Sequence, residues 1–526
     1  MKKILITEPF AQEAVNLLKE AGFEVVLNFN LTDAELMKEI TNFDGLIVRS
    51  KTKVNEKIIK AGNKLKIIGR AGVGVDNIDV ETATRQGVMV MNAPNANTIS
   101  TAELAILFIM ALSRNFYQAV HSTKEGKWEK SKFNGSELYK KTLGIIGLGR
   151  IGTQVAKRAM SFGMEVVAFD PFVSRDKEKT LNIKLISFEE LLQKADYITL
   201  HLALTKESYH LLNEEAFKKM KTGVRIVNCA RGGIIDEEAL FNAIKEKKVI
   251  GCGLDVFEKE PPLNSPLLKL SEVIITPHLG ASTQEAQVNV SLQMAKQFKN
   301  ALLNEVIDNS INCPTIDSSI LATMQPYITI SEKMGSFQGQ LTEESIEKIE
   351  ITYTGDLTNN QTQILTLSFL KGFLACIIPS TVNYVNAMLV AKERGIKVVE
   401  KHSNYQEDFP NLITAEITTP NTKSSVSGTL LGKNDLRIVK INGYRVDVYP
   451  SGHLLFCMNV DKPGVVSHIS SVLTEVGVNI ANMTVGREAA GGQALIVLNI
   501  DNTISKEVLL KIKENPIITK AVLVEL

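Results

Sequence analysis

Apolar positions in the first hundred residues fall in short runs that alternate with stretches of helical spacing. Lys3–Ile6, Gly45–Val48 and Lys66–Ile68 are apolar enough to be buried strands, and Ala11–Ala21 and Asp33–Ile40 have the periodicity of amphipathic helices. Apolar strands that alternate with helices are typical of a parallel sheet with helices on both faces. The pattern therefore predicts an α/β unit at the start of the chain.

A second series of the same kind follows a long helix predicted over Ile99–Thr123. Its strands are expected at Leu143–Ile146, Glu165–Phe169, Tyr197–Leu200, Arg225–Asn228 and Gly251–Asp255. Another long helix is predicted from Ser282 to about Asn304, and it would carry the chain back to the first unit. We therefore expect a discontinuous first domain, 1–98 plus 283–312, and a second domain, 99–282.

The pattern changes after this helix. Residues 313–450 combine helical stretches with strands that contain glycine and threonine, such as Ser424–Gly432, and predict a third domain of mixed α/β type. Residues 453–526 predict strand, helix, strand, strand, helix and strand, the order of a ferredoxin-like βαββαβ unit. The predicted fold class is α/β: two doubly wound parallel-sheet domains of flavodoxin or Rossmann type, a mixed domain and a ferredoxin-like domain.

Composition and charge argue against several classes of partner. With 526 residues, 44% hydrophobic and 22% charged, the chain is long enough for about three or four globular domains. A formal net charge of +1 gives no reason to expect binding to nucleic acid or to an anionic membrane. Five cysteines without a Cys-x-x-Cys pair predict neither a disulfide framework nor a metal site, and they fit a reducing cytoplasm. Neither a signal peptide nor a membrane span is expected.

A glycine fingerprint, Gly147-Leu148-Gly149-Arg150-Ile151-Gly152, lies between a predicted strand and a predicted helix. In this context the first glycine permits a tight turn, the second lets the backbone approach a pyrophosphate, and the third allows close helix packing. The helix N-terminus offers free N–H groups to the phosphates. Asp170, at the end of the next strand, is placed to accept from ribose hydroxyls and would repel a 2′-phosphate. The pattern predicts NAD rather than NADP; the alternative is a glycine-rich turn in a cofactor-free domain.

Arg231 follows a predicted strand, within Asn228-Cys229-Ala230-Arg231-Gly232-Gly233. Open α/β folds bind ligands at the carboxyl ends of their strands. A guanidinium binds a carboxylate through two hydrogen bonds and stays charged throughout a reaction. Arg231 is therefore a candidate to bind a substrate carboxylate; the alternative is a structural ion pair.

His278 lies between Pro277 and Leu279-Gly280. Oxidation of a hydroxyl group needs a base that takes the O–H proton, and histidine titrates closest to neutral pH. Glu260 is the expected partner that favours the imidazolium and orients the ring, with Glu258 as a nearby competitor. His201 and His210 are interpreted as structural.

These motifs, in this order, resemble the D-isomer-specific 2-hydroxyacid dehydrogenases. The resemblance rests on Gly147–Gly152, Asn228–Gly233, Asp255–Pro261 and Pro277–Thr283, and it spans about residues 1–310. The substrate loop is expected at Gly69–Asp79. The remainder of the chain is similar to the long members of the family, which carry an intervening allosteric-substrate-binding domain and a C-terminal ACT domain.

The resemblance implies NAD-dependent oxidation of D-3-phosphoglycerate to 3-phosphohydroxypyruvate, the first step of phosphorylated L-serine biosynthesis. Arg231, Glu260 and His278 would be the catalytic residues. The implied substrate-binding positions are Arg49 and Arg70 for the phosphate, the backbone of Val73 and Gly74 for the carboxylate, and Lys130, which stands where arginine is common. The implied cofactor-binding positions are Gly147, Gly149, Arg150, Ile151, Gly152, Asp170, Cys229, Ala230, Arg231, Asp255, His278, Gly280 and Ala281.

The C-terminal segment contains Val460-Asp461-Lys462-Pro463-Gly464 and Gly477-Val478-Asn479-Ile480, which resemble the amino-acid-binding pattern of ACT domains. The resemblance implies that Asp461 and Asn479 bind L-serine as a feedback effector in a homodimer or homotetramer. The alternative for this segment is a dimerisation module without a ligand. For the whole chain, the alternatives are another member of the family, such as a hydroxypyruvate or glyoxylate reductase, and a non-catalytic NAD- or serine-sensing protein.

Overall fold

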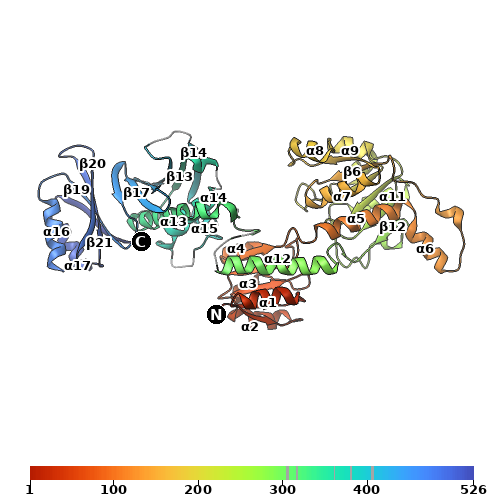
Figure 1. Cartoon of the computed structure of the whole chain (residues 1–526), viewed down its shortest axis with the longest axis horizontal. Helices are drawn as coiled ribbons and strands as arrows, with labels where there is room; N and C mark the ends of the chain where they lie inside the picture. The colour runs from red at the N-terminus through yellow and green to blue at the C-terminus, as the bar shows by residue number, and fades with distance from the viewer. Residues whose placement is uncertain (304–306, 308, 316–317, 360–361, 379–381, 404–407) are drawn as a thin grey trace.

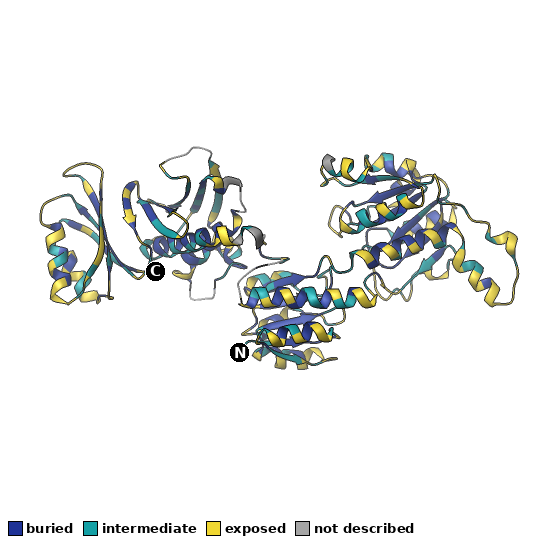
Figure 2. Ribbon diagram, viewed as in Figure 1, coloured by how far each residue is buried: buried dark blue, intermediate teal, exposed yellow. Residues whose placement is uncertain are grey.

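The computed structural model describes residues 1–303, 307, 309–315, 318–359, 362–378, 382–403 and 408–526. Four sheets lie along an elongated molecule, in which the unit of the first sheet stands between those of the third and the second (Figure 1). Their strands are the most buried segments, with helices that expose one face to solvent (Figure 2). The predicted fold class is confirmed: two parallel sheets, a mixed sheet and an antiparallel sheet of ferredoxin-like order. The predicted helix end at Asn304 lies outside the described residues.

The first sheet has the order β2-β1-β3-β4-β5, and all its strands are parallel. The strands are β1 (Lys3–Ile6), β2 (Glu24–Leu27), β3 (Gly45–Val48), β4 (Ile67–Arg70) and β5 (Met89–Asn92). The helices of this part are α1 (Gln12–Glu20), α2 (Asp33–Glu39), α3 (Glu56–Ala61) and α4 (Val80–Arg85). The carboxyl ends of these strands, and the loops after them, hold Arg49, Arg70 and their neighbours.

A helix from much later in the chain, α12 (Gln284–Leu303), completes the core of this first sheet (Figure 1). Its Phe298 is fully buried against the strands. A Cβ atom at Gly45 or Gly69 would lie 2.9 or 2.4 Å from the Phe298 ring, so these two strand positions need glycine. The packing of α12 on α1 brings residues about 280 positions apart into one core.

The second sheet has seven parallel strands in the order β12-β11-β10-β9-β6-β7-β8. They are β6 (Thr142–Ile146), β7 (Glu165–Phe169), β8 (Lys184–Leu185), β9 (Tyr197–Leu200), β10 (Val224–Asn228), β11 (Val249–Leu254) and β12 (Val273–Ile275). The helices are α7 (Arg150–Ser161), α8 (Arg175–Leu181), α9 (Phe188–Lys194), α10 (Glu214–Lys219) and α11 (Glu237–Lys245). The glycine fingerprint joins β6 to α7, at the centre of this sheet.

The single helix predicted over Ile99–Thr123 is wrong. The structure has two helices, α5 (Thr98–Ser113) and α6 (Phe116–Lys124), bent by 67° relative to each other. Asn115 between them adopts a left-handed conformation with φ 48°, which an α-helix does not continue through. Among the described residues no single helix is long and apolar enough to cross a membrane; α5 and α6 meet that test only when taken together despite the bend.

The third sheet is mixed, with the order β14-β13-β15-β16-β17-β18. Its strands are β13 (Lys348–Gly355), β14 (Lys397–Ser403), β15 (Asn411–Thr418), β16 (Lys423–Leu431), β17 (Asp435–Ile441) and β18 (Tyr444–Val448). Only β13 and β14 pair in parallel. The helices are α13 (Ser318–Leu341), α14 (Gln363–Ala375) and α15 (Ala387–Glu393). Asn383, just before α15, donates to the carbonyl of Gly87 at 2.8 Å and so joins this part to the first sheet's unit.

The fourth sheet has the order β20-β21-β19-β22. Its elements are β19 (His453–Val460), α16 (Val465–Glu475), β20 (Ile480–Arg487), β21 (Gln493–Ile500), α17 (Lys506–Lys513) and β22 (Ile518–Glu525). One face packs on α16 and α17, and the other shares a core with α13, where Phe337 meets Phe456 edge to face at 6.1 Å. The ferredoxin-like sheet is therefore covered by helices on both faces.

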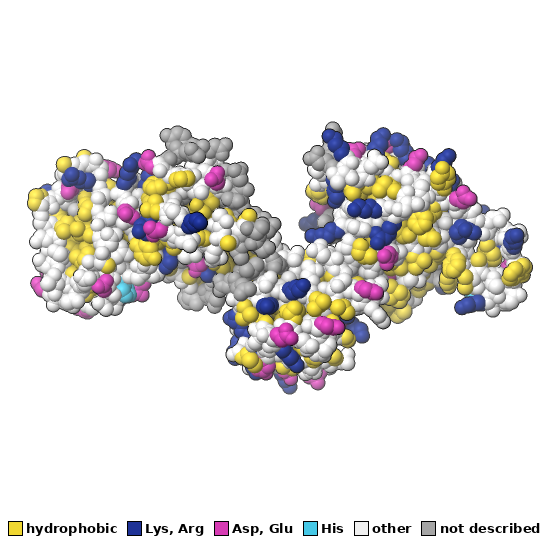
Figure 3. Space-filling model, in the orientation of Figure 1, with side chains coloured by type: hydrophobic (Ala, Val, Ile, Leu, Met, Phe, Trp, Pro, Cys, Tyr) yellow, Lys and Arg dark blue, Asp and Glu magenta, His cyan; other side chains and the backbone are white. Residues whose placement is uncertain are grey.

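Charged side chains of both signs are interspersed over the visible face of the molecule, in keeping with the net charge of +1 (Figure 3). Within the described part of the chain no cluster of three or more His, Cys, Asp or Glu side chains has the arrangement of a metal site.

Candidate active site

The glycine loop forms an open cradle in front of α7. Gly147 has φ +94°, and a Cβ there would lie 2.5 Å from the carbonyl oxygen of His201. A Cβ at Gly152 would lie 2.1 Å from the Gly147 carbonyl oxygen, whereas a Cβ at Gly149 would meet no heavy atom within 4 Å. Gly149 precedes the first turn of α7, and no side chain caps the helix there. Free N–H groups and open space at a helix N-terminus fit the pyrophosphate of a dinucleotide.

Asp170 lies directly beyond β7 and leans against this loop. Its Oδ2 accepts from the Leu148 N–H at 2.8 Å and its Oδ1 from the Phe172 N–H at 2.9 Å. Arg150 is exposed and Ile151 half-buried in the first turn of α7. The fingerprint residues, Arg150, Ile151 and Asp170 therefore lie together around the loop between β6 and α7.

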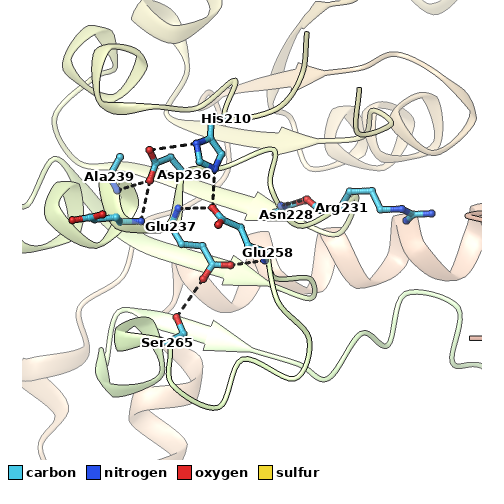
Figure 4. A network of polar contacts seen from close by, with 9 residues as sticks. His210, Asn228, Arg231, Asp236, Glu237, Ala239, Glu258 and Ser265 are labelled. Atoms are coloured by element: carbon cyan, nitrogen blue, oxygen red, sulfur yellow. Dashed lines mark hydrogen bonds and ion pairs between the residues drawn. The ribbon is translucent and has the colours of Figure 1, made fainter. Parts of the chain in front are cut away.

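The turn after β10 aims Arg231 away from the sheet. Asn228 is buried; it donates from Nδ2 to the Arg231 carbonyl at 2.9 Å and accepts at Oδ1 from the Ala230 N–H at 3.0 Å. Burial raises the pKa of the neighbouring Cys229 thiol, so this side chain is a neutral, apolar wall. Arg231 extends from this turn into the space in front of the sheet (Figure 4).

His278 and Glu260 come from two different loops and meet in a hydrogen bond. The Glu260 Oε2 lies 2.8 Å from His278 Nδ1, and Glu260 Oε1 accepts from the Phe257 N–H at 3.2 Å. Burial alone would raise the pKa of Glu260, but the hydrogen bond and charge of His278, the Phe257 N–H and Arg231 together hold it below its ordinary value. Glu260 is therefore a carboxylate at neutral pH.

Glu258, the competitor of Glu260 in the sequence, binds elsewhere. Its Oε1 lies 3.0 Å from His210 Nε2, and Glu237 Oε1 accepts from the Glu258 N–H at 2.7 Å (Figure 4). His210 also lies 3.6 Å from Asp236 and stacks on Tyr209 at 4.0 Å. This network fastens the loop that carries Glu260 to the start of α11.

Asp255 fastens the loop that carries His278. It is 1% exposed, and its Oδ1 accepts from the Thr276 hydroxyl and the Leu279 N–H, both at 2.6 Å. Its Oδ2 accepts from the Gly280 N–H at 2.8 Å. From the other side, Ser100 and Thr101 of α5 donate to the Gly280 carbonyl, and Gln287 of α12 donates to that of Ala281. Asp255 is one of the implied cofactor-binding positions, and both its carboxylate oxygens are thus engaged within the chain.

Three guanidinium groups converge between the first two sheets. Arg231 Nε lies 3.5 Å from Asp76 Oδ2, and a Cβ at Gly74 would lie 2.1 Å from Arg231 Nη2, so the 73–74 backbone lies against Arg231. Burial, followed by the charges of Arg231 and Arg49, lowers the pKa of Arg70, against the opposite effect of Asp76 and Glu8. The Arg70 Nε is buried and has no hydrogen-bond partner among the described residues. A multiply charged anion would stabilise such mutually repelling cations and could accept from the unused donor.

Lys130 is not brought to these arginines within the chain. It begins a short 3₁₀ helix, Lys130–Phe133, that packs on α6. In Figure 1, α6 projects from the second sheet's unit on the side away from α1. Asp461 and Asn479, at the ends of β19 and β20, are equally remote: Asp461 pairs with Arg487 at 2.9 Å and Asn479 donates to Asp501 at 2.9 Å.

Comparison with known proteins gives three matching family models. Residues 106–280 match the NAD-binding domain of D-isomer-specific 2-hydroxyacid dehydrogenases, 323–442 match the D-3-phosphoglycerate dehydrogenase intervening domain, and 453–516 match the ACT domain. D-3-phosphoglycerate dehydrogenase of Methanocaldococcus jannaschii is 43% identical over 527 residues, and each chain is covered completely. The chain belongs to the D-3-phosphoglycerate dehydrogenase family. It is accordingly an NAD-dependent oxidoreductase, as the sequence predicted.

Two further members of the D-3-phosphoglycerate dehydrogenase family illustrate the range of the likeness. The Bacillus subtilis protein is 42% identical over 526 residues, with full coverage of both chains. The NAD⁺-bound 3-phosphoglycerate dehydrogenase of Entamoeba histolytica is 34% identical, with a TM-score of 0.51, over 59% of this chain and 98% of its own. That structure supports the dinucleotide cradle in the part of the chain it covers.

Four further residues at the site are not among the predicted site residues. Glu8, Asp76, Asn77 and Asn92 all touch the loops that carry the arginines. Asp76 and Asn77 belong to the substrate loop expected at Gly69–Asp79, so that motif contained a signal for them. Glu8 and Asn92 had none, because each is an isolated polar residue at the end of an apolar strand.

Proposed function

We propose that the protein oxidises D-3-phosphoglycerate to 3-phosphohydroxypyruvate. The observation that supports this most is the meeting of three arginines from both sheet units, one of which, Arg231, also lies near Glu260 of the His278–Glu260 pair. A 3-phosphoglycerate molecule carries anionic groups at both ends and the reacting hydroxyl group between them. The names of the full-length relatives agree with this substrate.

In this proposal each charged end of the substrate has its own cations. Arg49 and Arg70 bind the phosphate, while Arg231 and the backbone N–H groups of Val73 and Gly74 bind the carboxylate. Glu260 occupies Nδ1 of His278, which leaves Nε2 to accept the proton of the C2 hydroxyl group. When bound in the glycine cradle, NAD⁺ supplies the acceptor for the C2 hydride.

Closure of the two units around the substrate would exclude water from this chemistry. Arg49 and Arg70 lie on the first unit and Arg231, Glu260 and His278 on the second, so a bound substrate would bridge them. Asp170 and its neighbours would bind the adenosine end of NAD, with the ribose hydroxyls near the Asp170 carboxylate.

The test is NADH formation from D-3-phosphoglycerate, D-glycerate and D-lactate under the same conditions. We expect kcat/KM to be highest for the phosphorylated acid, because only it uses Arg49 and Arg70. Better turnover of D-glycerate or D-lactate would favour another 2-hydroxyacid dehydrogenase. An absence of turnover with every acid, together with measurable NAD binding, would favour the sensing protein.

We also propose that L-serine is an effector that binds the ACT domain, in a homodimer or homotetramer. Arg487 and the Gly491 N–H hold the pKa of Asp461 below its ordinary value, so Asp461 is an anion that can accept from an α-ammonium group. Titration calorimetry with L-serine, on the wild type and on Asp461→Ala, tests this, with sedimentation measured at each serine concentration. No heat from the wild type would contradict the proposal. The five cysteines are unpaired, which fits the proposed location in the cytoplasm.

A further inference from the structure

The loop after β3 carries Arg49 and has its backbone tied on two sides. Residues 49–52 connect β3 to the segment before α3, and they contain no helix or strand. Backbone groups of such a loop need partners from elsewhere. Two side chains, Glu8 and Asn77, provide them, one for the N–H groups and the other for the carbonyl groups.

Glu8 supplies the acceptors. It follows β1, is 6% exposed, and accepts at Oε1 from the N–H of Arg49 at 2.8 Å and of Thr52 at 3.0 Å. Its Oε2 accepts from the Lys51 N–H at 3.2 Å. A buried carboxylate that accepts from three backbone N–H groups fixes the direction of each peptide group.

Asn77 supplies the donors. Its Nδ2 donates to the carbonyl oxygens of Arg49 and Thr52, both at 2.7 Å. Asn77 lies in the substrate loop after β4, only a few residues beyond Gly74. The same side chain therefore sets the distance between the Arg49 loop and the loop that lies against Arg231.

The Glu8 carboxylate accepts from these N–H groups, and it also lies near the guanidinium groups of Arg49 and Arg70. Burial lowers the pKa of Arg49, and the charge of Glu8 opposes that shift. Glu8 has the same effect on Arg70. Because Arg49 also lies close enough to Arg70 to affect it, a displacement of the loop would change the spacing of the two cations.

We infer that Glu8 and Asn77 are positioning residues for the phosphate subsite: they hold Arg49 at the spacing from Arg70 that a phosphate monoester needs. The inference rests on the proposed function, since it gives a task to the two arginines assigned to the phosphate. It predicts an effect that depends on the substrate. Binding of the phosphate should weaken, whereas the contacts of Arg231 with the carboxylate and of His278 with the hydroxyl group, both made from the second unit, should be affected little.

The experiment compares Glu8→Gln and Asn77→Ala with the wild type, using D-3-phosphoglycerate and D-glycerate as substrates. A glutamine keeps the shape of Glu8, but its NH2 group replaces one of the two acceptor oxygens. That NH2 group would then face a backbone N–H group of the Arg49 loop, and neither can accept. The matched control is Glu13→Gln, an exposed acid on α1 of the same unit. We expect KM for D-3-phosphoglycerate to rise roughly tenfold in both test variants, with kcat nearly unchanged. The kcat/KM for D-glycerate should stay within about twofold of the wild type, and competitive inhibition by inorganic phosphate should weaken in parallel.

The outcomes separate the two claims. If the wild type shows no preference for the phosphorylated acid, the proposed function fails. If that preference exists but both variants lose activity equally toward both acids, Glu8 and Asn77 serve the fold as a whole and the inference fails. Loss of folding in both variants, seen as loss of the thermal transition, would overturn it in the same way. If Glu8→Gln alone does not fold, Asn77→Ala decides, because it acts on the opposite side of the same loop.

Discussion

The Oε2 atom of Glu260 lies 2.8 Å from Nδ1 of His278, although the two side chains stand on loops that follow different strands. Each loop is fastened separately, the first through Glu258 and the second through Asp255. The pair therefore has a fixed geometry before any ligand arrives, which is what acid–base catalysis requires of its orienting carboxylate.

Glu260→Gln should lower kcat about tenfold to a hundredfold, because the imidazolium formed during oxidation loses its counter-charge. KM for the substrate should change little, since Glu260 contacts neither charged end. Steady-state rates of NADH formation measure both quantities. Glu258→Gln is the comparison within the same loop, and a greater loss of kcat there than in Glu260→Gln would contradict the assignment.

Asp255→Asn should lower both the thermal stability and kcat. An asparagine presents an amide group to at least one of the N–H groups of Leu279 and Gly280, and an unsatisfied buried donor costs about 1–3 kcal/mol. Thr276→Val, which removes only one donor to the same carboxylate, should act in the same direction but less. If Asp255 instead serves mainly the nicotinamide carboxamide, NADH affinity will fall while the melting temperature stays unchanged.

Much of this fold follows from periodicity alone. Buried parallel strands such as β3 are short apolar runs that alternate with amphipathic helical stretches, so the pattern predicts them and the α/β class. The break between α5 and α6 could not be predicted in this way. Asn115 can adopt the left-handed conformation more readily than most residues, but a single asparagine in a helical pattern does not by itself mark a break.

The sequence predicts those site residues whose role is marked by a local motif. Arg231, Glu260 and His278 lie in motifs with glycine or proline beside them, and the structure brings them together. Glu8 serves backbone groups about 41 positions away, and no local pattern marks such a contact. For Asp255 the reverse holds, because a motif marks the residue itself. Its hydrogen-bond partners, the N–H groups of Leu279 and Gly280, are evident only from the folded loop.

Asp76→Asn should lower KM for the substrate by up to about fivefold, the strength of an exposed ion pair. Its carboxylate, 3.5 Å from Arg231, competes with the carboxylate of the substrate for the same guanidinium. We expect kcat to be unchanged, because Asp76 does not touch His278 or Glu260. Glu81→Gln, an exposed acid of the same unit paired with Arg85, serves as the control. An increase in KM would mean that Asp76 supports the substrate loop more than it competes.

His201→Gln should reduce the loss of stability in acid. Burial lowers the pKa of His201 from 6.5 to about 3, and its Nδ1 has no hydrogen-bond partner among the described residues. Between these two values the unfolded chain binds a proton that the folded chain does not, so stability rises with pH across that window. Each unit of acidification below about pH 6.5 therefore costs about 1.4 kcal/mol through this one side chain.

Thermal melting of the wild type and His201→Gln, from neutral pH down to about pH 4.5, measures the difference. The glutamine can keep the contact with the Thr199 hydroxyl, which lies 2.9 Å from His201 Nε2, but it does not titrate. We expect the melting temperature of the wild type to fall more steeply with decreasing pH than that of His201→Gln, whatever their offset at neutral pH. His121→Gln, on the exposed surface of α6, should follow the wild type throughout. Parallel curves for the wild type and His201→Gln would show that the buried imidazole is protonated in the folded protein, and that its environment accommodates the charge.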